Sequence, residues 1–577
     1  MKKPLVFLLI LTLLLGLFAA CGRETPEASV SEAADSETGT LESEVEAPAE
    51  VQEPAEVQDS SASQEEALPE DDGSGQEESE PEPEPAYFPL DETGTLTMFF
   101  TYPPIEGTIN GPEDYVVFKE AEERLNVHID FNAVSIPASG DQFALLVASG
   151  DYPDILPEVA RYYTGGMSKA LEDEVIVDLS PYLEDYAPNY QAARIRNEMN
   201  ARNTMADDGS VYGFYLLWTL EDAVPDSGLG IRQDWLDRLG LDVPRTIDEL
   251  HDTLTAMQTL GCENPYDITY SGGCDDAILE AYDCTWSYGS PGLVAIDGEI
   301  QASGVSEGTY EYVKMMNQWY QEGLIDPDFY SQFNYALSLR DSIVSEKRGV
   351  FFIQNINIDA YQAAIGGDAV IVPMSSVGFE PDQTFHVRPA SGTENNSFAI
   401  TTDCSDLELA MRYLDWFYTD EGEILCNYGV EGQAFEYDEN GNPQYTELIT
   451  NNESGQNTAI TLYTGYKAVP NMLISSRLNG CNSESYVAAG EKWSDRQDAA
   501  YAISTQVSLT AEETEAVSLI LSEIETYTQE HLIKMITGDE YVETQWESYC
   551  QGIRDLGLQT VIDTYQAAYD RYMQRGA

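Results

Sequence analysis

The chain has 577 residues, with 103 Asp and Glu against 27 Lys and Arg and a formal net charge of −76. This length exceeds one ordinary domain of about 100–200 residues and predicts two or three lobes. The charge argues against nucleic-acid binding, which depends on clustered lysines and arginines, and against purely electrostatic docking to an anionic membrane. An anionic ligand would need a local basic pocket, whereas a neutral or cationic ligand would not.

The first residues have the pattern of a secretory signal peptide. Lys2 and Lys3 precede an apolar run over residues 5–17, and the small pair Ala19-Ala20 comes before Cys21. This pattern predicts a cleaved leader over residues 1–20, because the apolar run is too short to span a membrane. Cys21 resembles the lipidated cysteine of the bacterial lipobox and predicts an anchor on the extracellular face of the cell membrane. The alternative is a plain signal peptide with a chance cysteine.

Residues 21–90 are expected to form an extended linker. Between residues 22 and 85 the chain carries 22 acidic residues and one basic residue, Arg23, among many Pro, Ser and Ala residues. Such a stretch repels itself and lacks the apolar surface that folding needs. Without the leader and this linker, the chain still has 81 acidic and 24 basic residues, so the linker does not account for the charge.

Helical and strand-like patterns alternate along the first part of the body. A strand over residues 95–100 is followed by a helix over 112–125, a strand over 127–131, a helix over 142–149 and a buried strand over 154–156. Gly150 is expected to end the second helix. This order predicts a parallel sheet with helices on its faces.

The second part of the body carries clearer helix signals. A short helix is expected over 231–239, ending at Gly240, and capping boxes open helices at Thr246 and Thr510. The last helical stretch covers residues 542–573. Asn440-Gly441 predicts a hairpin turn, because the surrounding acidic loop lacks the glycine and the final glutamate of a calcium site.

No motif for a cofactor or metal is found. The eight cysteines contain no Cys-x-x-Cys pair, and the four histidines contain no His-x-x-x-His pair. Cys274 and Cys284 either pair across a loop or remain free thiols. We therefore expect no cofactor.

One motif raises the possibility of an enzyme. Residues 304–308 fit the Gly-x-Ser-x-Gly elbow, with Ser306 as nucleophile and His386 or His531 as the base. The favoured interpretation is that Ser306 or Thr309 caps a helix over 310–320. We expect a binding protein and not an enzyme. The alternatives are a secreted glycan hydrolase or esterase, and a surface adhesin for polysaccharide.

Five blocks in order resemble the extracellular solute-binding proteins of family 1, and more narrowly the LplA-type lipoproteins of carbohydrate ABC transporters. They lie at residues 141–155, 231–246, 320–329, 413–432 and 538–575. The resemblance implies an α/β fold of two lobes, like the periplasmic binding proteins of type II, in which each lobe is a sheet flanked by helices and a hinge joins the lobes. Residues 261–265 replace the calcium loop of many relatives with too few oxygen ligands for this ion.

We divide the chain accordingly, with crossovers near residues 226 and 385. Lobe 1 is expected over 91–225, lobe 2 over 226–384, a return to lobe 1 over 385–430, and lobe 2 with the terminal helices over 431–577.

The implied function is capture of a small solute, such as an oligosaccharide, by a monomer that closes around it and delivers it to an ABC transporter permease. Aromatic and polar side chains in loops facing the interlobe cleft are the expected ligand contacts, because sugar C–H faces pack on rings and sugar hydroxyls need polar partners. These candidates are Tyr102, Asp151, Tyr162, Tyr163, Trp218, Trp286, Asn355, Asn357, Arg388 and Trp493. For Trp493 a core role is the stronger interpretation.

Overall fold

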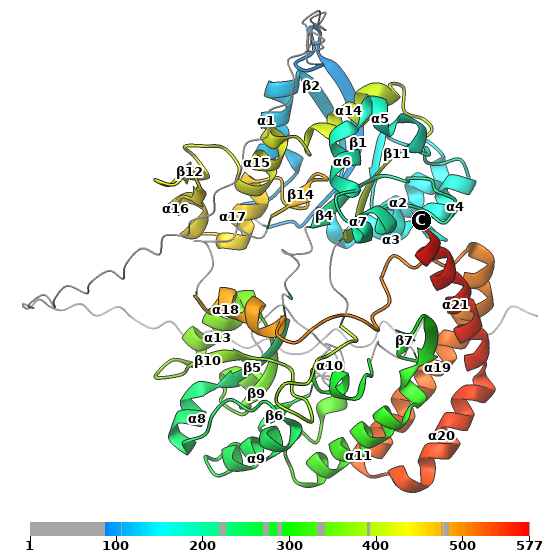
Figure 1. The fold of residues 1–577 in the computed structure, drawn as a ribbon. Helices are drawn as coiled ribbons and strands as arrows, with labels where there is room; N and C mark the ends of the chain where they lie inside the picture. The colour runs from blue at the N-terminus through cyan, green and yellow to red at the C-terminus, as the bar shows by residue number, and fades with distance from the viewer. Residues whose placement is uncertain are drawn as a thin grey trace, which may run out of the picture. The chain divides into compact units, whose positions relative to one another are not determined.

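The computed structural model describes most of the chain beyond residue 86, namely residues 87–105, 107–218, 225, 227–268, 276–285, 291–331, 341–388, 393–474, 477 and 484–575. The predicted signal peptide, Cys21, nearly all of the linker, Cys274 and Trp286 lie outside the described residues. Within the described part of the chain, no helix is both long enough and apolar enough to cross a membrane. Two separate main sheets, each with its own helices, build the body (Figure 1).

The first sheet has six strands in the order β14-β4-β11-β3-β1-β2. β1 runs parallel to both β2 and β3, as predicted, and its register with β2 extends from Gly94 opposite Val127 to Tyr102 opposite Ser135. β11 is antiparallel to its neighbours β3 and β4, which makes the sheet mixed. The strands are β1 (Gly94–Tyr102), β2 (Val127–Ser135), β3 (Ile155–Pro157), β4 (Phe214–Trp218), β11 (Thr393–Ile400) and β14 (Met472–Leu473).

Helices around this sheet come from two distant parts of the sequence. The first set is α1 (Val116–Leu125), α2 (Ser139–Ser149), α3 (Val159–Tyr162), α4 (Gly166–Glu172), α5 (Leu183–Tyr186), α6 (Pro188–Arg194) and α7 (Glu198–Asn203). The second set is α14 (Leu407–Trp416), α15 (Asp420–Tyr428), α16 (Glu447–Thr450) and α17 (Gln456–Tyr463). Both sets share one core, in which Leu96 and Phe100 of β1 pack with Met411 of α14 and Leu425 of α15.

The second sheet has four strands in the order β10-β5-β9-β6. These strands are β5 (Ser227–Arg232), β6 (Tyr266–Asp267), β9 (Val350–Gln354) and β10 (Ile371–Met374). The helices that belong with them are α8 (Gln233–Leu239), α9 (Ile247–Gln258), α10 (Asp276–Leu279), α11 (Glu307–Gln321), α12 (Asp341–Val344), α13 (Ile358–Ile365) and α18 (Glu484–Trp493). Their large core also takes in the C-terminal helices.

Three helices end the chain: α19 (Ala511–Thr537), α20 (Val542–Leu556) and α21 (Leu558–Gln574). Gly557, with φ 111°, separates the last two and breaks the helical stretch predicted over 542–573. Two hairpins complete the fold, β7 (Leu293–Ile296) with β8 (Glu299–Ala302) and β12 (Phe435–Tyr437) with β13 (Pro443–Tyr445). The second hairpin turns at Asn440-Gly441, as predicted.

The return to the first lobe is longer than predicted. The sequence analysis ends it at residue 430, but β14 pairs with β4 of the first sheet, and Leu462 and Val469 lie in the first core. The chain rejoins the second lobe at α18, whose Trp493 packs with the second sheet. A two-residue strand such as β14 has no sequence pattern of its own, so the sequence could not indicate its pairing with β4.

The short helix predicted over 231–239 also begins later. Ile231 and Arg232 are the last residues of β5, and the helix starts at Gln233. Gly150 and Gly240 end α2 and α8 in the left-handed conformation, as predicted. Both capping boxes are formed, with the hydroxyls of Thr246 and Thr510 accepting from the third backbone N–H of α9 and α19.

Candidate functional site

A cavity of about 810 Å³ opens at the first sheet. Its lining residues come from the carboxyl ends of β1 and β3, from α4, from the end of α7 and the start of β4, from the segment after α17, and from residues 505–509 before α19. In open α/β sheets, ligands bind beyond the carboxyl ends of the strands. The cavity therefore lies where a ligand site is expected, and its volume is in the range of about 300–1,000 Å³ typical of small-molecule sites.

A buried carboxylate fixes the two strands that lead into the cavity. Asp154, just before β3, accepts hydrogen bonds from the backbone N–H and the hydroxyl of Thr97 on β1, both at 2.7 Å, and from the N–H of Ser405 at 3.1 Å. Burial opposes ionisation of Asp154, but these hydrogen bonds outweigh it and lower its pKa. The start of β3 is thus held beside the middle of β1.

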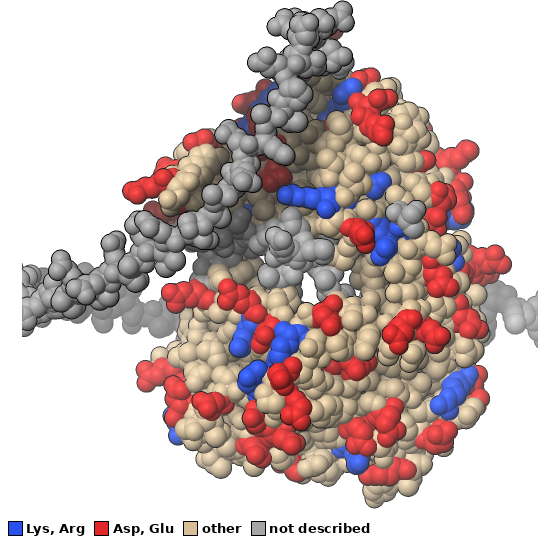
Figure 2. Space-filling model, in the orientation of Figure 1, with Lys and Arg blue, Asp and Glu red and all other residues tan. Residues whose placement is uncertain are grey.

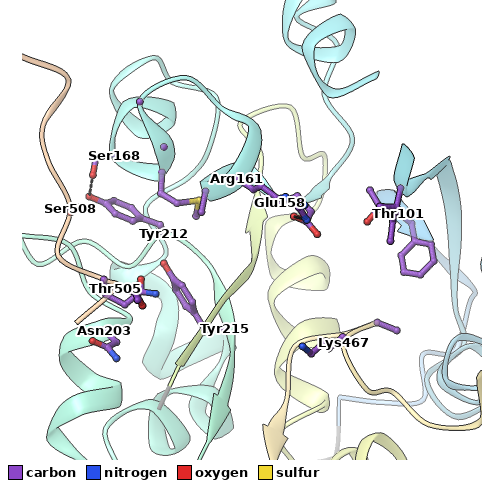
Figure 3. Close-up of a pocket in the computed structure, with 18 of the residues that line it drawn as sticks. Thr101, Glu158, Arg161, Ser168, Asn203, Tyr212, Tyr215, Lys467, Thr505 and Ser508 are labelled. Atoms are coloured by element: carbon purple, nitrogen blue, oxygen red, sulfur yellow. Dashed lines mark hydrogen bonds and ion pairs between the residues drawn. The ribbon is translucent and has the colours of Figure 1, made fainter. Parts of the chain in front are cut away.

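One wall of the cavity is aromatic. Tyr212 and Tyr215 lie close to each other with Asn203 and Thr505 in Figure 3, and the Tyr212 hydroxyl is 3.1 Å from the Ser168 hydroxyl. Burial raises the pKa of both the Tyr212 and the Tyr215 phenol, so both side chains stay neutral. Neutral rings with hydroxyls suit a polyhydroxylated ligand.

The opposite side of the cavity carries charge. Thr101 and Lys467 lie there in Figure 3, with Glu158 and Arg161 between them and the tyrosines. Glu158 comes directly before α3 at φ 65°, and its carboxylate is 3.8 Å from the Arg161 guanidinium. Burial raises the pKa of Glu158, and Arg161 only partly offsets this effect.

The far end of the chain forms the rim. Arg575 donates to the carboxylate of Asp207 at 2.7 Å, to the carbonyl of Gln506 at 3.1 Å and to the hydroxyl of Ser508 at 2.9 Å. Arg571 donates to Asp207 at 2.6 Å and to both carboxylate oxygens of Glu513. Because Asp207 follows α7 of the first lobe, these contacts hold the 505–509 segment and α21 against the cavity wall.

Four predicted ligand residues of the first lobe are not among the lining residues of the cavity: Tyr102, Asp151, Tyr162 and Tyr163. Thr101 and Arg161 line it, while their neighbours Tyr102 and Tyr162 are half-buried and are not among its lining residues. The Tyr162 hydroxyl is 2.7 Å from that of Ser139. Tyr163 donates to Asp173 at 2.9 Å, and Asp151 is exposed after α2.

Trp218 and Arg388 lie near the first two of the three crossings between the lobes. Trp218 ends β4 half-buried, and its indole N–H has no hydrogen-bond partner among the described residues. Arg388 donates to the Ser227 carbonyl at 3.5 Å, and its guanidinium is 3.9 Å from the buried carboxylate of Glu280. Trp286 lies outside the described residues.

The remaining candidates belong to the second lobe. Asn355 is buried directly after β9, and Asn357 donates to the Gln354 side chain at 3.4 Å. Trp493 is 2% exposed and donates to the Leu229 carbonyl at 2.9 Å. A Cβ atom on Gly228 would lie 2.5 Å from its indole ring, so Trp493 is a tightly packed core residue.

The elbow motif at residues 304–308 forms a helix cap in the structure. The Ser306 hydroxyl accepts from the Thr309 N–H at 3.3 Å and lies 3.2 Å from the Cys284 sulfur. His386 pairs with Asp498 at 2.7 Å and His531 with Glu540 at 2.8 Å. No histidine of the described residues is hydrogen-bonded to Ser306.

Comparison with known proteins identifies the family. The model of the bacterial extracellular solute-binding proteins matches residues 106–424, which is more than half of the chain. The chain belongs to this family. Its members are substrate-binding proteins, and the solved structures below have two lobes, as the described architecture does.

The chain matches curated relatives at low sequence identity but over more than half of its length. The chain is 25% identical to Lipoprotein LipO of Bacillus subtilis, over 58% of this chain and 66% of LipO, just under two thirds of its length. It is 23% identical to the fructooligosaccharide ABC transporter substrate-binding protein FusA of Streptococcus pneumoniae, over 84% of this chain and 92% of FusA. A crystal structure of an extracellular solute-binding protein from Bifidobacterium longum subsp. infantis matches 84% of this chain and 99% of its own, at 18% identity and a TM-score of 0.69.

Sequence reasoning missed most of the residues that line the cavity. Tyr212 and Tyr215 carry an aromatic signal, but Asn203, Thr505 and Ser508 are ordinary polar residues far apart in the sequence. They meet because contacts such as that between Arg575 and Asp207 join the end of the chain to α7. No local pattern could have indicated this.

Proposed function

We propose that this protein captures an oligosaccharide in the cavity and delivers it to the permease of an ABC transporter. The observation that carries the proposal is the position of a cavity of about 810 Å³ at the carboxyl ends of β1 and β3, with Tyr212 and Tyr215 beside polar side chains. Rings pack against the C–H faces of sugars, and the polar groups replace water at the hydroxyls.

The relatives support a sugar as ligand. FusA is named for fructooligosaccharides, and a second relative from Bacillus subtilis, 24% identical over 56% of this chain, is named a polygalacturonan/rhamnogalacturonan-binding protein. Their names also support the transporter as partner, since FusA is described as an ABC transporter substrate-binding protein.

The proposed mechanism is closure of the two lobes. The chain passes between the lobes after β4, after β10 and after β14, so closure would bend these connections. Closure would also have to accommodate the contacts of α21 and Ser504 with Asn203 and Asp207. A ligand that contacts both lobes favours the closed form by its differential affinity for that form. The permease would recognise the closed, loaded protein.

The sequence also supports a lipid anchor on Cys21 at the extracellular face. A Cys21→Ala chain expressed in the native host tests this proposal. We expect the variant to be released into the medium, while the unmodified protein stays with the membrane fraction. Equal membrane retention of both chains would argue against the anchor.

The main experiment is a thermal-shift screen of the purified chain against oligosaccharides, followed by calorimetry. A sugar at 100 times its dissociation constant should stabilise the folded state by about 2.7 kcal/mol. Turnover of the sugar, lost in Ser306→Ala, would favour the hydrolase or esterase instead. Binding of long polymers without binding of short sugars would favour the adhesin.

A further inference from the structure

Glu158 has an unusual position in the wall of the cavity. We infer that its carboxylate accepts hydrogen bonds from two adjacent hydroxyl groups of the captured sugar, so that the site takes an oligosaccharide with a free diol at this point. This inference rests on the proposed function. The evidence is the backbone conformation of this one residue, its burial and the hydrogen bonds that its side chain lacks.

The backbone of Glu158 adopts a conformation that few residues with a side chain take. The residue directly follows the last residue of β3, at the carboxyl end of that strand, with φ 65° and ψ 12°. A Cβ atom is crowded in this left-handed region, which is why glycine usually fills it. Of the described lining residues other than glycine, only Glu158 and Lys467 have a positive φ. Strained backbone of this kind is concentrated at functional sites.

The side chain of Glu158 does not serve the helix that follows it. At the position directly before a helix, Ser, Thr, Asp or Asn usually bonds a free backbone N–H with its side chain. Glu158 makes no such bond to α3, and only its backbone carbonyl contributes, accepting from the N–H groups of Arg161 and Tyr162 at 3.1 Å. Any residue would supply that carbonyl. Local structure therefore does not require a glutamate here, and such exceptions to local rules are expected at functional sites.

The Glu158 carboxylate is also largely buried without a hydrogen-bond donor. The side chain is 20% exposed, and its ion-pair partner Arg161 is 3.8 Å away and itself 63% exposed. No residue that the structure describes donates a hydrogen bond to this carboxylate. Burial raises its pKa more than Arg161 lowers it. Removal of water from a carboxylate is unfavourable unless other donors replace the water, so the two oxygens are suited to donors on a ligand.

An acidic residue by itself is no sign of a site in this chain, which has 103 of them. Figure 2 shows acidic side chains scattered over most of the visible face, in positions open to water. Glu158 differs because it lines the cavity, and Figure 3 shows it between the tyrosines Tyr212 and Tyr215 on one side and Thr101 on the other. A sugar that packs on the tyrosines would have hydroxyls beside this carboxylate.

A carboxylate is well matched to a diol. Its two oxygens accept hydrogen bonds side by side, and hydroxyls on neighbouring sugar carbons donate in the same arrangement. Hydrogen bonds to a charged acceptor are also stronger than those between neutral groups. Because β3 precedes Glu158 and α3 follows it, both ends of its backbone are fixed before the ligand arrives.

The first test measures direct contact by calorimetry on the purified chain. The probes are maltotriose, cellotriose, galactotriose and inulotriose, together with the monodeoxy forms of the tightest binder. We expect Glu158→Gln to weaken binding of the intact sugar about tenfold, the value of one charge-assisted hydrogen bond. A deoxy sugar that lacks a donating hydroxyl should bind the unchanged chain about tenfold more weakly than the intact sugar does. In the Glu158→Gln variant this difference should shrink, because the two changes remove the same contact.

The second test separates ligand contact from a structural role. Glu158→Gly removes the carboxylate and relieves the left-handed backbone, so the melting temperature should stay the same or rise while sugar affinity falls at least about tenfold. Glu174→Gly and Glu174→Gln are the matched controls. Glu174 is also a glutamate with a positive φ, of 58°, but it is exposed and is not among the lining residues. Neither control should change sugar affinity.

The outcomes that would overturn the inference differ from those that would overturn sugar capture. Unchanged affinity in Glu158→Gln and Glu158→Gly, whatever their melting temperatures, would refute the contact and leave sugar capture intact. So would a deoxy sugar series that loses as much affinity in Glu158→Gln as in the unchanged chain. Failure of the four trisaccharides and of every sugar in the wider screen to bind would count against the proposed function itself, and the inference would fall with it.

Discussion

The hydroxyl of Tyr572 on α21 donates a hydrogen bond of 2.7 Å to the side-chain oxygen of Asn203 at the end of α7. The Ser504 hydroxyl donates to the same oxygen at 3.0 Å. α21 is also attached to the β7–β8 hairpin, because Gln566 accepts from the N–H of Ile300 and donates to the carbonyl of Gly298. The last helix therefore links the cavity wall of the first lobe to elements that pack with the second lobe.

Removing the Tyr572 hydroxyl tests this link. Tyr572→Phe should lower the free energy of unfolding by about 1 kcal/mol, since it removes one buried hydrogen bond and leaves Asn203 with fewer donors. Tyr569→Phe is the matched control on the same helix, because no hydrogen bond of its hydroxyl to a described residue is found. Thermal melts of both variants measure the difference. Equal melting temperatures for the two would show that the contact contributes nothing.

Asp207 is the second anchor of the last helix. Asp207→Asn weakens the ion pairs of this residue to Arg571 and to the buried Arg575. We therefore expect the free energy of unfolding in urea to fall by about 1–2 kcal/mol, a value that allows for the partial exposure of Asp207. Because Arg575 also holds residues 506 and 508 at the cavity, sugar binding should weaken as well. Asp563→Asn, an exposed change on α21, should alter neither quantity. Loss of stability with unchanged affinity would contradict a role for the rim in binding.

The pH dependence of stability has one identifiable contributor in the first lobe. Burial raises the pKa of Asp415 to about 6, although Tyr190 N–H and the Asn189 side chain each donate to it at 2.7 Å. The folded state therefore favours the protonated acid, and this group adds stability as the pH falls from about 6 to 4. The effect is at most about 3 kcal/mol.

Asp415→Asn should keep the shape of the side chain and remove its titration. Relative to the unchanged protein, we expect the variant to lose the stability gain between pH 6 and 4. Urea unfolding at a series of pH values measures this difference, with Asp555→Asn on the surface as the control. A parallel pH profile for Asp415→Asn would contradict the assignment.

Trp218 and Trp493 were both candidate ligand contacts in the sequence analysis, with a core role favoured for Trp493, and the structure gives them different surroundings. Trp218→Phe should weaken sugar binding about tenfold with little change in stability, since its indole N–H has no partner among the described residues. Trp493→Phe should lower stability by about 1–3 kcal/mol, because it loses both packing and the bond to Leu229. Melting curves and calorimetry on the two variants separate the roles. The opposite pattern would exclude Trp218 from the site.

Local signals in the sequence predicted much of the fold. The glycines at 150 and 240 end helices because only glycine readily adopts the left-handed conformation found there. The capping boxes at Thr246 and Thr510 could also be predicted from the sequence, because their hydrogen bonds join residues only three positions apart. The division into two lobes followed from the family resemblance.

Features that depend on distant residues were not predictable. β14 joins the first sheet only because β4 is already in place, so the return to the first lobe was drawn too short. The cavity depends on contacts such as that between Asp207 and Arg575, which are separated by most of the chain. The sequence therefore indicated residues near the cavity, such as Tyr102 and Tyr162, better than the residues that line it.

The most direct test of the account is native mass spectrometry of the purified chain mixed with a panel of short oligosaccharides. The account predicts a complex of one chain with one intact sugar, and release of the same sugar with its mass unchanged. Absence of any complex across the panel, or recovery of cleaved sugar, would contradict it.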